Sequence, residues 1–290
     1  MNLIDCFMYF DEDLLLDIRL NILNKYVKKF VICEAAFLHN GSAKKLRFKI
    51  EKFKKFKDKI IYLTVENQPA NLIIKKNGNY TNSNILDNAL IRENYQRNFL
   101  MNGIKNFSDE DLIMISDIDE IPNLKKFNYK NKISIFMQRM FYYKFNLVYP
   151  NFFWSGSKIC KKKDLISPQW LRNIKTKNFP FWRFDLIFSK KKYRNLNIIN
   201  DGGWHFTNIK SAEQIDFKMK NFLHHFEYDK SGINTNDIKE LISKKKILYD
   251  YKADQREDKW RNNRKLENYP IEKLPDYIKL NKNKFSEWID

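Results

Sequence analysis

Short apolar runs alternate with amphipathic segments along the first part of the chain. Four runs have the length and β-branched content of buried strands: residues 3–10, 29–36, 60–65 and 112–115. The segments between them predict helices, one beginning after Asp11 as N-cap, one over residues 44–57 and one over residues 84–107. Strands alternating with helices are typical of a central, mostly parallel, Rossmann-like sheet flanked by helices, an α/β fold.

The later part of the chain has a different pattern. Residues 132–159 are rich in aromatic residues and predict hairpin-like strands, and residues 178–189 repeat that character. Ser211 and Gln214 have the spacing of a capping box, which predicts a helix beginning there.

Residues 236–248 predict a further helix, and the aromatic tail over 254–290 is expected to pack against the body. Neither a repeat nor a linker interrupts the chain, so we predict a single domain over residues 1–290 with a β-rich aromatic region and a helical C-terminal part.

Three acids follow the apolar run 112–115: Asp117, Asp119 and Glu120. Ligands collect at the carboxyl ends of strands in open α/β sheets, and two aspartates spaced by one residue can both face a divalent cation. Pro122 is expected to help stop the strand, because proline cannot donate to a ladder. The alternative is an acidic turn that binds nothing.

Polar residues elsewhere could complete a site at this tip. The run 29–36 ends near Glu34, and the helix 84–107 carries Arg92, Arg97 and Asn98. The polar side of that helix could face a bound nucleotide, although Glu93 and Arg97 also have the i,i+4 spacing of an ordinary helix-surface ion pair.

The stretch Asn-Asp-Gly-Gly-Trp-His-Phe-Thr over residues 200–207 is the second informative motif. Its two glycines permit close approach of the backbone before Trp204 and His205. Asp117, Asp119 and His205 are the candidate metal ligands; carboxylates suit Mn²⁺ or Mg²⁺, and a histidine ligand favours Mn²⁺. The alternative is a histidine packed beside tryptophan without a metal.

This combination suits a nucleotide-sugar site, because a cation neutralises the diphosphate leaving group as the glycosidic bond breaks. Arg97 or Arg183 could pair with the phosphates. If the reaction inverts the anomeric centre, a carboxylate must take the proton of the acceptor hydroxyl. Spacing does not choose among Asp185, Glu120 and Asp164 for that role.

Composition changes this interpretation little. The formal net charge of +19 suggests attraction to phosphates, anionic membranes or acidic glycans, but the lysines are spread along the 290 residues. The three cysteines form no C-x-x-C pair and are expected to be reduced. Because no signal peptide or bilayer-length apolar window stands out, we expect a cytoplasmic protein with possible peripheral contact to an anionic membrane.

Five sequence blocks, taken in order, resemble glycosyltransferase family 17: LIDCFMYFDEDLLLDIRLNIL, KFVICEAAFLHNGSAKKLRF, RENYQRNFLMNGI, DLIMISDIDEIP and GGWHFTN. This is the group that contains the β-1,4-mannosyl-glycoprotein 4-β-N-acetylglucosaminyltransferase. The resemblance implies a GT-A-like fold, a UDP-sugar donor such as UDP-GlcNAc and inverting transfer to a glycan or glycolipid acceptor. It extends to the region of His205 and weakens in the tail.

The resemblance also implies roles for single residues. Asp119 matches the direct metal ligand of the D-x-D motif, and Asp117 lies nearer the ribose or the metal. Arg97 and Asn98 match an Arg-Asn pair that often precedes this motif, and His205 matches a C-terminal metal-binding histidine. The candidate donor-binding residues are Glu34, Arg92, Arg97, Asn98, Asp117 and Trp204.

The resemblance divides the predicted domain into a nucleotide-sugar-binding half over 1–125, an acceptor-side half over 126–210 and the helical part over 211–290. The animal members are Golgi membrane proteins, whereas this sequence begins directly at the first strand, so we do not expect bisecting activity on N-glycans.

Two other classes of protein share some of these features. A metal-dependent phosphoryl or nucleotidyl transferase also uses paired aspartates, but the chain has no Gly-rich phosphate loop. A basic nucleic-acid-binding protein would have clustered Lys and Arg with exposed aromatics, whereas the aromatics here lie in apolar runs, so no nucleic-acid partner is expected.

Overall fold

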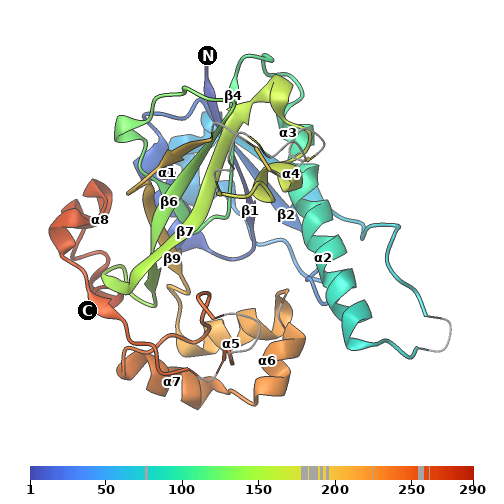
Figure 1. The fold of residues 1–290 in the computed structure, drawn as a ribbon, viewed down its shortest axis with the longest axis vertical. Coiled ribbons are helices and arrows are strands. Elements are labelled where there is room, and N and C mark those ends of the chain that lie inside the picture. The colour runs from blue at the N-terminus through green and yellow to red at the C-terminus, as the bar shows by residue number, and fades with distance from the viewer. Residues whose placement is uncertain are drawn as a thin grey trace.

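The structure is a computed structural model that describes residues 1–75, 78–177, 182, 189, 192–193, 196–223, 225–253, 258–260 and 262–290. Within these residues the protein is a mixed α/β fold with a curled, mostly parallel sheet and helices on its faces (Figure 1). The strands follow the order β3-β2-β1-β4-β7-β6-β9-β5, with β8 beside β6 and β10 beside β7.

The first half of the sheet consists of four parallel strands, each formed by one of the predicted apolar runs. They are β1 (Leu3–Tyr9), β2 (Lys29–Ala35), β3 (Ile60–Val65) and β4 (Leu112–Ser116). Apolar residues cover both faces of these strands, as a sheet sandwiched between helices requires. The predicted parallel arrangement is therefore confirmed for this half.

The second half is mixed. Its strands are β5 (Glu120–Pro122), β6 (Ile133–Tyr142), β7 (Leu147–Lys161), β8 (Asn197–Ile199), β9 (Gly203–Thr207) and β10 (Glu267–Asn268). β7 pairs antiparallel with β4 and β6, whereas β9 runs parallel to β6 and antiparallel to β5. The β-rich region expected over 132–159 is confirmed, but most of residues 178–189 lie outside the described part of the chain.

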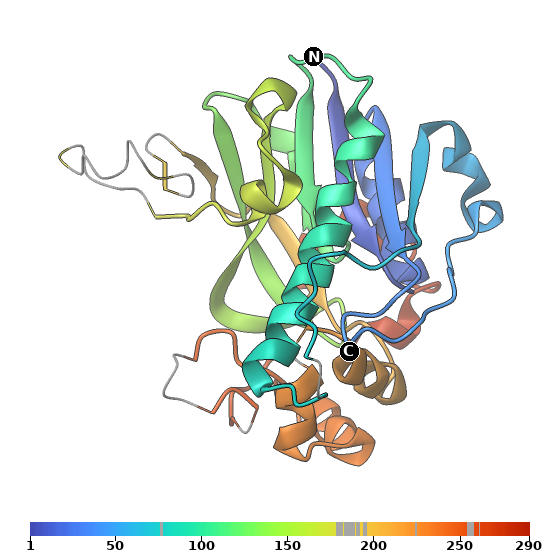
Figure 2. The same cartoon turned by 90° about the vertical axis from the view of Figure 1, so that its right-hand side faces the viewer.

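Helices cover the two faces of the sheet (Figure 2). α1 (Asp13–Leu23) packs on the face formed by Phe7, Phe30 and Met114, together with α8 (Asp276–Leu280). α2 (Asn82–Phe99), α3 (Met101–Ile104) and α4 (Pro168–Arg172) lie on the other face, formed by alternate residues such as Cys6 and Val31. This alternation follows from the two-residue period of a strand.

Three short helices lie beyond the carboxyl ends of the parallel strands (Figure 1). They are α5 (Ala212–Asn221), α6 (His225–Ser231) and α7 (Thr235–Ser243). The predicted capping box of Ser211 and Gln214 begins α5. α7 ends earlier than predicted, because the chain turns at Lys245 with a φ of 50° and buries Ile247 and Leu248 in a separate cluster.

The last residues pack against the α1 face of the sheet, as predicted for the tail. The side chain of Phe285 is fully buried there, and Tyr269, Tyr277 and Trp288 pack against the same cluster. Among the described residues, none of the helices is both long and apolar enough to span a bilayer.

Two further predicted helices are wrong in extent. Residues 44–49 form neither helix nor strand, and only a 3₁₀ helix over Ile50–Lys59 follows. The buried carboxylate of Glu34 explains this, because it accepts hydrogen bonds from the backbone N–H groups of Arg47 (2.8 Å) and Phe48 (3.0 Å), which a helix would pair within itself.

The helix expected over 84–107 is interrupted between α2 and α3 at Leu100. Its second part packs very close to the sheet: a Cβ on Gly103 would lie 2.4 Å from a methyl carbon of Val31. A residue without a side chain is therefore required at Gly103.

Candidate active site

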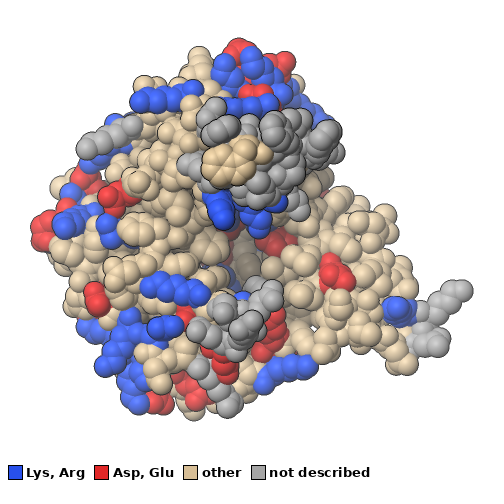
Figure 3. All heavy atoms as spheres, in the orientation of Figure 1, with Lys and Arg blue, Asp and Glu red and all other residues tan. Residues whose placement is uncertain are grey.

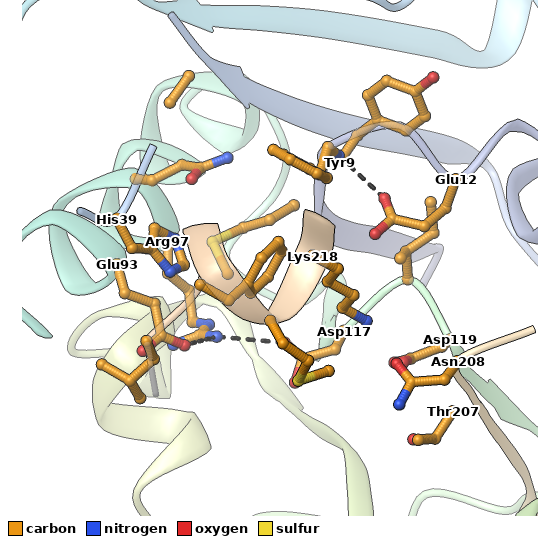
Figure 4. Close-up of a pocket in the computed structure, with 18 of the residues that line it drawn as sticks. Tyr9, Glu12, His39, Glu93, Arg97, Asp117, Asp119, Thr207, Asn208 and Lys218 are labelled. Carbon is orange, nitrogen blue, oxygen red and sulfur yellow. Dashed lines mark hydrogen bonds and ion pairs between the residues drawn. The ribbon is translucent and has the colours of Figure 1, made fainter. Parts of the chain in front are cut away.

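A cavity of about 220 Å³ opens at the carboxyl ends of β1, β2 and β4, under α5 (Figure 4). This is where open α/β sheets bind their ligands. Apolar side chains from β1, the loop after β2 and the helical part line it together with titratable groups. The titratable lining residues are Tyr9, Glu12, His39, Glu93, Arg97, Asp117, Asp119, His205, Lys218 and Tyr251.

The loop that links β4 to β5 brings Asp117 and Asp119 into the cavity. Asp117, Ile118 and Asp119 all contribute to the lining, and Ile118 is 6% exposed and also packs in the core, which anchors the loop between the two acids. Pro122 does not end β4, contrary to our expectation. It lies in β5, where an edge position tolerates a residue without an N–H group.

Arg19, a residue of α1, fixes the backbone of this loop. Its guanidinium is fully buried, and it donates to both carboxylate oxygens of Asp5 (2.6 and 2.8 Å) and to the carbonyl oxygens of Asp117 (3.2 Å) and Glu120 (2.6 Å). The ion pair neutralises the buried charges while the remaining N–H groups fix the loop backbone. Arg19 and Asp5 are therefore positioning residues beneath the D-x-D loop.

Asp119 and His205 meet at one wall of the cavity. Asp119 Oδ1 lies 3.3 Å from His205 Nε2, and the Asp119 carbonyl accepts a 2.9 Å hydrogen bond from Phe206 N on β9. Burial opposes the imidazolium, yet the carboxylates of Asp119, Glu120 and Asp117 outweigh it and raise the pKa of His205. Burial also opposes ionisation of Asp119, and His205 outweighs that effect and lowers the pKa of Asp119.

This pair has the chemistry and spacing of two ligands to one divalent cation. Two ligand atoms at about 2.1 Å from an octahedral cation, at right angles, lie roughly 3 Å apart. The second ring nitrogen, His205 Nδ1, is buried without a hydrogen-bond partner. In the described part of the chain, no group of three His, Cys, Asp or Glu side chains converges at ligand spacing, so the predicted trio is not assembled.

Asp117 stands apart from this pair because two arginines hold its carboxylate. Arg97 lies 3.2 Å from Oδ1 and Arg172 lies 2.8 Å from Oδ2. Burial opposes ionisation of Asp117, but Arg172 and Arg97 outweigh it and hold the pKa of its carboxyl well below its usual range. Arg97 also pairs with Glu93 at 2.7 Å and donates to Gln169.

Glu120 is fully buried, and its two carboxylate oxygens accept four hydrogen bonds. The donors are Asp117 N (3.0 Å), Trp154 Nε1 (2.7 Å) and two nitrogens of Arg172 (2.9 and 3.0 Å). A carboxylate in this state is poorly suited to take a proton from an acceptor. Its geometry indicates that Glu120 positions Arg172 and the loop rather than acting as a base.

Of the other candidate bases, Asp164 does not line the cavity. Asp164 pairs with Lys132 at 3.0 Å in the turn after β7. Asp185 and Arg183 lie outside the described residues, so Asp185 stays a prediction.

Four candidate donor-binding residues do not line the cavity: Glu34, Arg92, Asn98 and Trp204. Glu34 is fully buried against Lys44 and the hydroxyl of Tyr62 (2.8 Å).

Arg92 donates to His39 O (3.1 Å) and Gln68 Oε1 (2.7 Å) and so fixes the loop after β2, while Asn98 accepts from Gln169 N (3.0 Å) and ties α2 to α4. Trp204 faces the opposite side of the sheet from His205, because successive strand residues point to opposite faces.

Sequence reasoning did not identify several residues of the cavity. Lys218 reaches into it from α5, and it has no carboxylate within ion-pair distance among the described residues (Figure 4). Tyr251 of the cavity wall and Arg172, which pairs with Asp117 behind the wall, come from segments that showed no site pattern. The one sequence feature that bears on Lys218 is the amphipathic spacing of α5, which predicted a helix with one buried face but did not indicate that a lysine lines a site.

The sequence was compared with protein-family models and with curated proteins. The model of glycosyltransferase family 17 matches residues 1–286. No curated protein matches the chain. A family match over almost the whole length agrees with a cavity that holds acids at a strand tip, and it makes the protein a glycosyltransferase. The chain belongs to glycosyltransferase family 17.

Proposed function

We propose that this protein is a metal-dependent, inverting glycosyltransferase with a GT-A-like fold, which moves GlcNAc from UDP-GlcNAc onto a hydroxyl of a glycan or glycolipid. The observation that carries the proposal is the pairing of Asp119 Oδ1 and His205 Nε2 at 3.3 Å, at the carboxyl end of β4. The parallel order β3-β2-β1-β4 supports the fold assignment.

Asp119 and His205 would hold a Mn²⁺ or Mg²⁺ ion, with the remaining positions open to diphosphate oxygens and water. When bound, such an ion neutralises charge on the leaving diphosphate. Binding of the ion competes with protonation of His205, whose pKa is raised by Asp119, so deprotonation of His205 accompanies ligation.

Lys218 supplies the protein's own positive charge to the leaving group. The other cation of the wall, Arg97, is already held by Glu93 and Asp117, whereas Lys218 is unpaired among the described residues and its charge lowers the pKa of Asp119. A flexible ammonium group that faces developing negative charge in a partly buried cavity stabilises the departing phosphate.

Apolar groups exclude water around the reacting atoms. Phe10, Phe37 and Met219 line the cavity, and Trp154 packs on the ring of His205 at 5.3 Å between centroids. Because the hydrogen bond from Trp154 Nε1 to Glu120 fixes the indole, the side of the site around His205 is preorganised.

The test is release of nucleoside diphosphate from a panel of nucleotide sugars, each with Mn²⁺, Mg²⁺ or chelator. UDP-GlcNAc with a cation is expected to give release, and chelator or Asp119→Asn is expected to abolish it. Asp109→Asn is the matched control, because Asp109 is exposed near the opposite end of β4.

Equal release of nucleoside diphosphate with chelator would contradict the proposed metal dependence. A preference for another nucleotide sugar would contradict UDP-GlcNAc as the donor. A thermal shift produced by Mn²⁺ in the parent protein and lost in Asp119→Asn checks the ion independently of turnover.

A further inference from the structure

A second cavity, of about 320 Å³, lies on the other side of β9 from the catalytic cavity. Trp204 lines it, while the next residue, His205, lines the catalytic cavity. Its other walls come from α1, the segment after β5 and the residues around α8, which lies beside α1 (Figure 1). The two cavities are thus separated by one strand of the sheet.

Aromatic side chains form part of this second cavity. Trp204, Tyr26 and Tyr277 are each partly exposed there, and no described residue accepts a hydrogen bond from Trp204 Nε1. Tyr277 is fixed by a 3.0 Å hydrogen bond from its hydroxyl to Asp17. Partly exposed rings that offer an apolar face and a polar edge suit ligands such as sugar rings, which have both C–H faces and hydroxyl groups.

Lysines surround these rings and outnumber the acids. Lys125 and Lys279 share one carboxylate, Asp276, at 2.8 and 2.7 Å. Lys25 and Lys273 have no carboxylate within ion-pair distance among the described residues. Glu272 is the other acid that the described residues contribute to the wall, so four lysines face two acids among them and this part of the cavity has an excess of positive charge.

We propose that this cavity is a second carbohydrate site that binds an acidic oligosaccharide, with Trp204 against a sugar ring and Lys25 and Lys273 on carboxylate groups. The proposal rests on the membership of a glycosyltransferase family and not on the metal or the donor proposed above. A glycan chain held here would stay on the enzyme while its reacting end is elsewhere, which raises its local concentration.

The experiment uses trigalacturonic acid as the acidic probe and maltotriose as its neutral counterpart. The protein is labelled with 5-fluorotryptophan, and the Trp204 signal is assigned with Trp204→Phe, which keeps an aromatic ring in the packed position. Trigalacturonic acid is expected to shift the Trp204 signal, and maltotriose is not expected to do so at the same concentration.

Charge reversal then tests the lysines. The double variant Lys25→Glu/Lys273→Glu is expected to weaken binding of trigalacturonic acid at least about tenfold, the equivalent of ~1.4 kcal/mol. Lys105→Glu is the control, since Lys105 is exposed at the end of α3, on the opposite face of the sheet. Asp119→Asn is expected to bind the probe as the parent does, which separates this site from the catalytic cavity.

Three results would overturn the proposal. They are equal binding of maltotriose, equal loss in Lys105→Glu, and absence of any Trp204 shift. Vesicles of phosphatidylglycerol and phosphatidylcholine form a further arm. Binding to vesicles through Lys25 and Lys273, without binding of the trisaccharide, would assign the surface to a membrane and so also contradict the proposal.

Discussion

Arg19 Nη1 donates a 2.6 Å hydrogen bond to the carbonyl oxygen of Glu120, which is 101 residues later in the sequence. The same side chain forms a fully buried ion pair with Asp5 on β1. The D-x-D loop is therefore fixed by a helix on the α1 face of the sheet, and its shape depends on a residue that does not line the catalytic cavity.

The first prediction separates this support from general stability. Arg19→Met leaves the Asp5 carboxylate buried and unpaired, so we expect a loss of ~3–5 kcal/mol in the free energy of unfolding. The double variant Asp5→Leu/Arg19→Met removes both charges, and we expect it to recover most of that stability but not transfer activity, because the loop carbonyls still lack their donor. Denaturant unfolding and turnover are measured on both variants. Full activity in the double variant would show that the loop needs no support from Arg19.

Lys218 provides the second prediction. Lys218→Met is expected to lower kcat/KM by about 10²-fold, the usual effect of removing one group that stabilises charge in a transition state. Lys220→Met is the matched control on the same helix, since Lys220 is half exposed and pairs with Asp216 at 2.7 Å. Steady-state kinetics with the proposed donor, UDP-GlcNAc, make the comparison. Equal effects of the two substitutions would contradict the role of Lys218.

Glu120 gives a prediction about the shape of a pH profile. Glu120→Gln disturbs the hydrogen bonds to Arg172 and Asp117 N, so we expect a lower free energy of unfolding and a lower rate. Because Glu120 is not expected to be the base, the acid limb of kcat/KM against pH is expected to keep its midpoint. Measurement of the full profile in parent and variant decides this, and loss of that limb would assign the proton transfer to Glu120.

Lys158 connects the site to the pH dependence of stability. Burial, assisted by Arg172, lowers the pKa of Lys158 to about 7, and its Nζ donates to Ile174 O at 2.8 Å. An unfolded lysine has a pKa of about 10.4, so between about pH 7 and 10.4 the unfolded chain binds a proton that the folded protein does not. The part of the free energy of unfolding that comes from Lys158 is therefore fully present above about pH 10.4, the pKa in the unfolded chain, and is lost as the pH falls toward about 7, the pKa in the folded protein.

The free energy of unfolding is therefore expected to rise from pH 7.5 to 9.5, relative to Lys158→Met, by at most about 1.4 kcal/mol per pH unit. Urea titrations at several pH values give the two slopes. The variant loses a constant amount from the carbonyls of Arg172 and Ile174, which no longer have Lys158 as donor, and this moves its curve without changing its slope. Parallel curves would show that Lys158 stays charged in the folded protein.

The distribution of charged side chains on the surface agrees with the small weight that we gave to net charge when we predicted binding partners. Figure 3 shows Lys and Arg side chains in several separate groups on the face that it presents. The net charge of +19 therefore says less about partners than the local excess of lysine in the second cavity does.

The sequence by itself determined the parallel half of the sheet and the position of Asp119 at a strand tip. Unbroken apolar runs can be buried only between two layers, and the acids that follow Ile115 mark where burial ends. The helix cap formed by Ser211 and Gln214 was also predictable from sequence, because its hydrogen bonds join residues that are only three apart.

Only the tertiary structure decided what surrounds those acids. Arg19, Arg172 and Lys218 reach the D-x-D loop or its cavity from three distant segments, and no local spacing encodes such contacts. The absence of a helix over residues 44–49 depends on Glu34, and the face of the sheet on which Trp204 lies depends on how β9 pairs with β5 and β6. Local pattern fixes which residues are buried in an element, whereas long-range pairing fixes which of them meet.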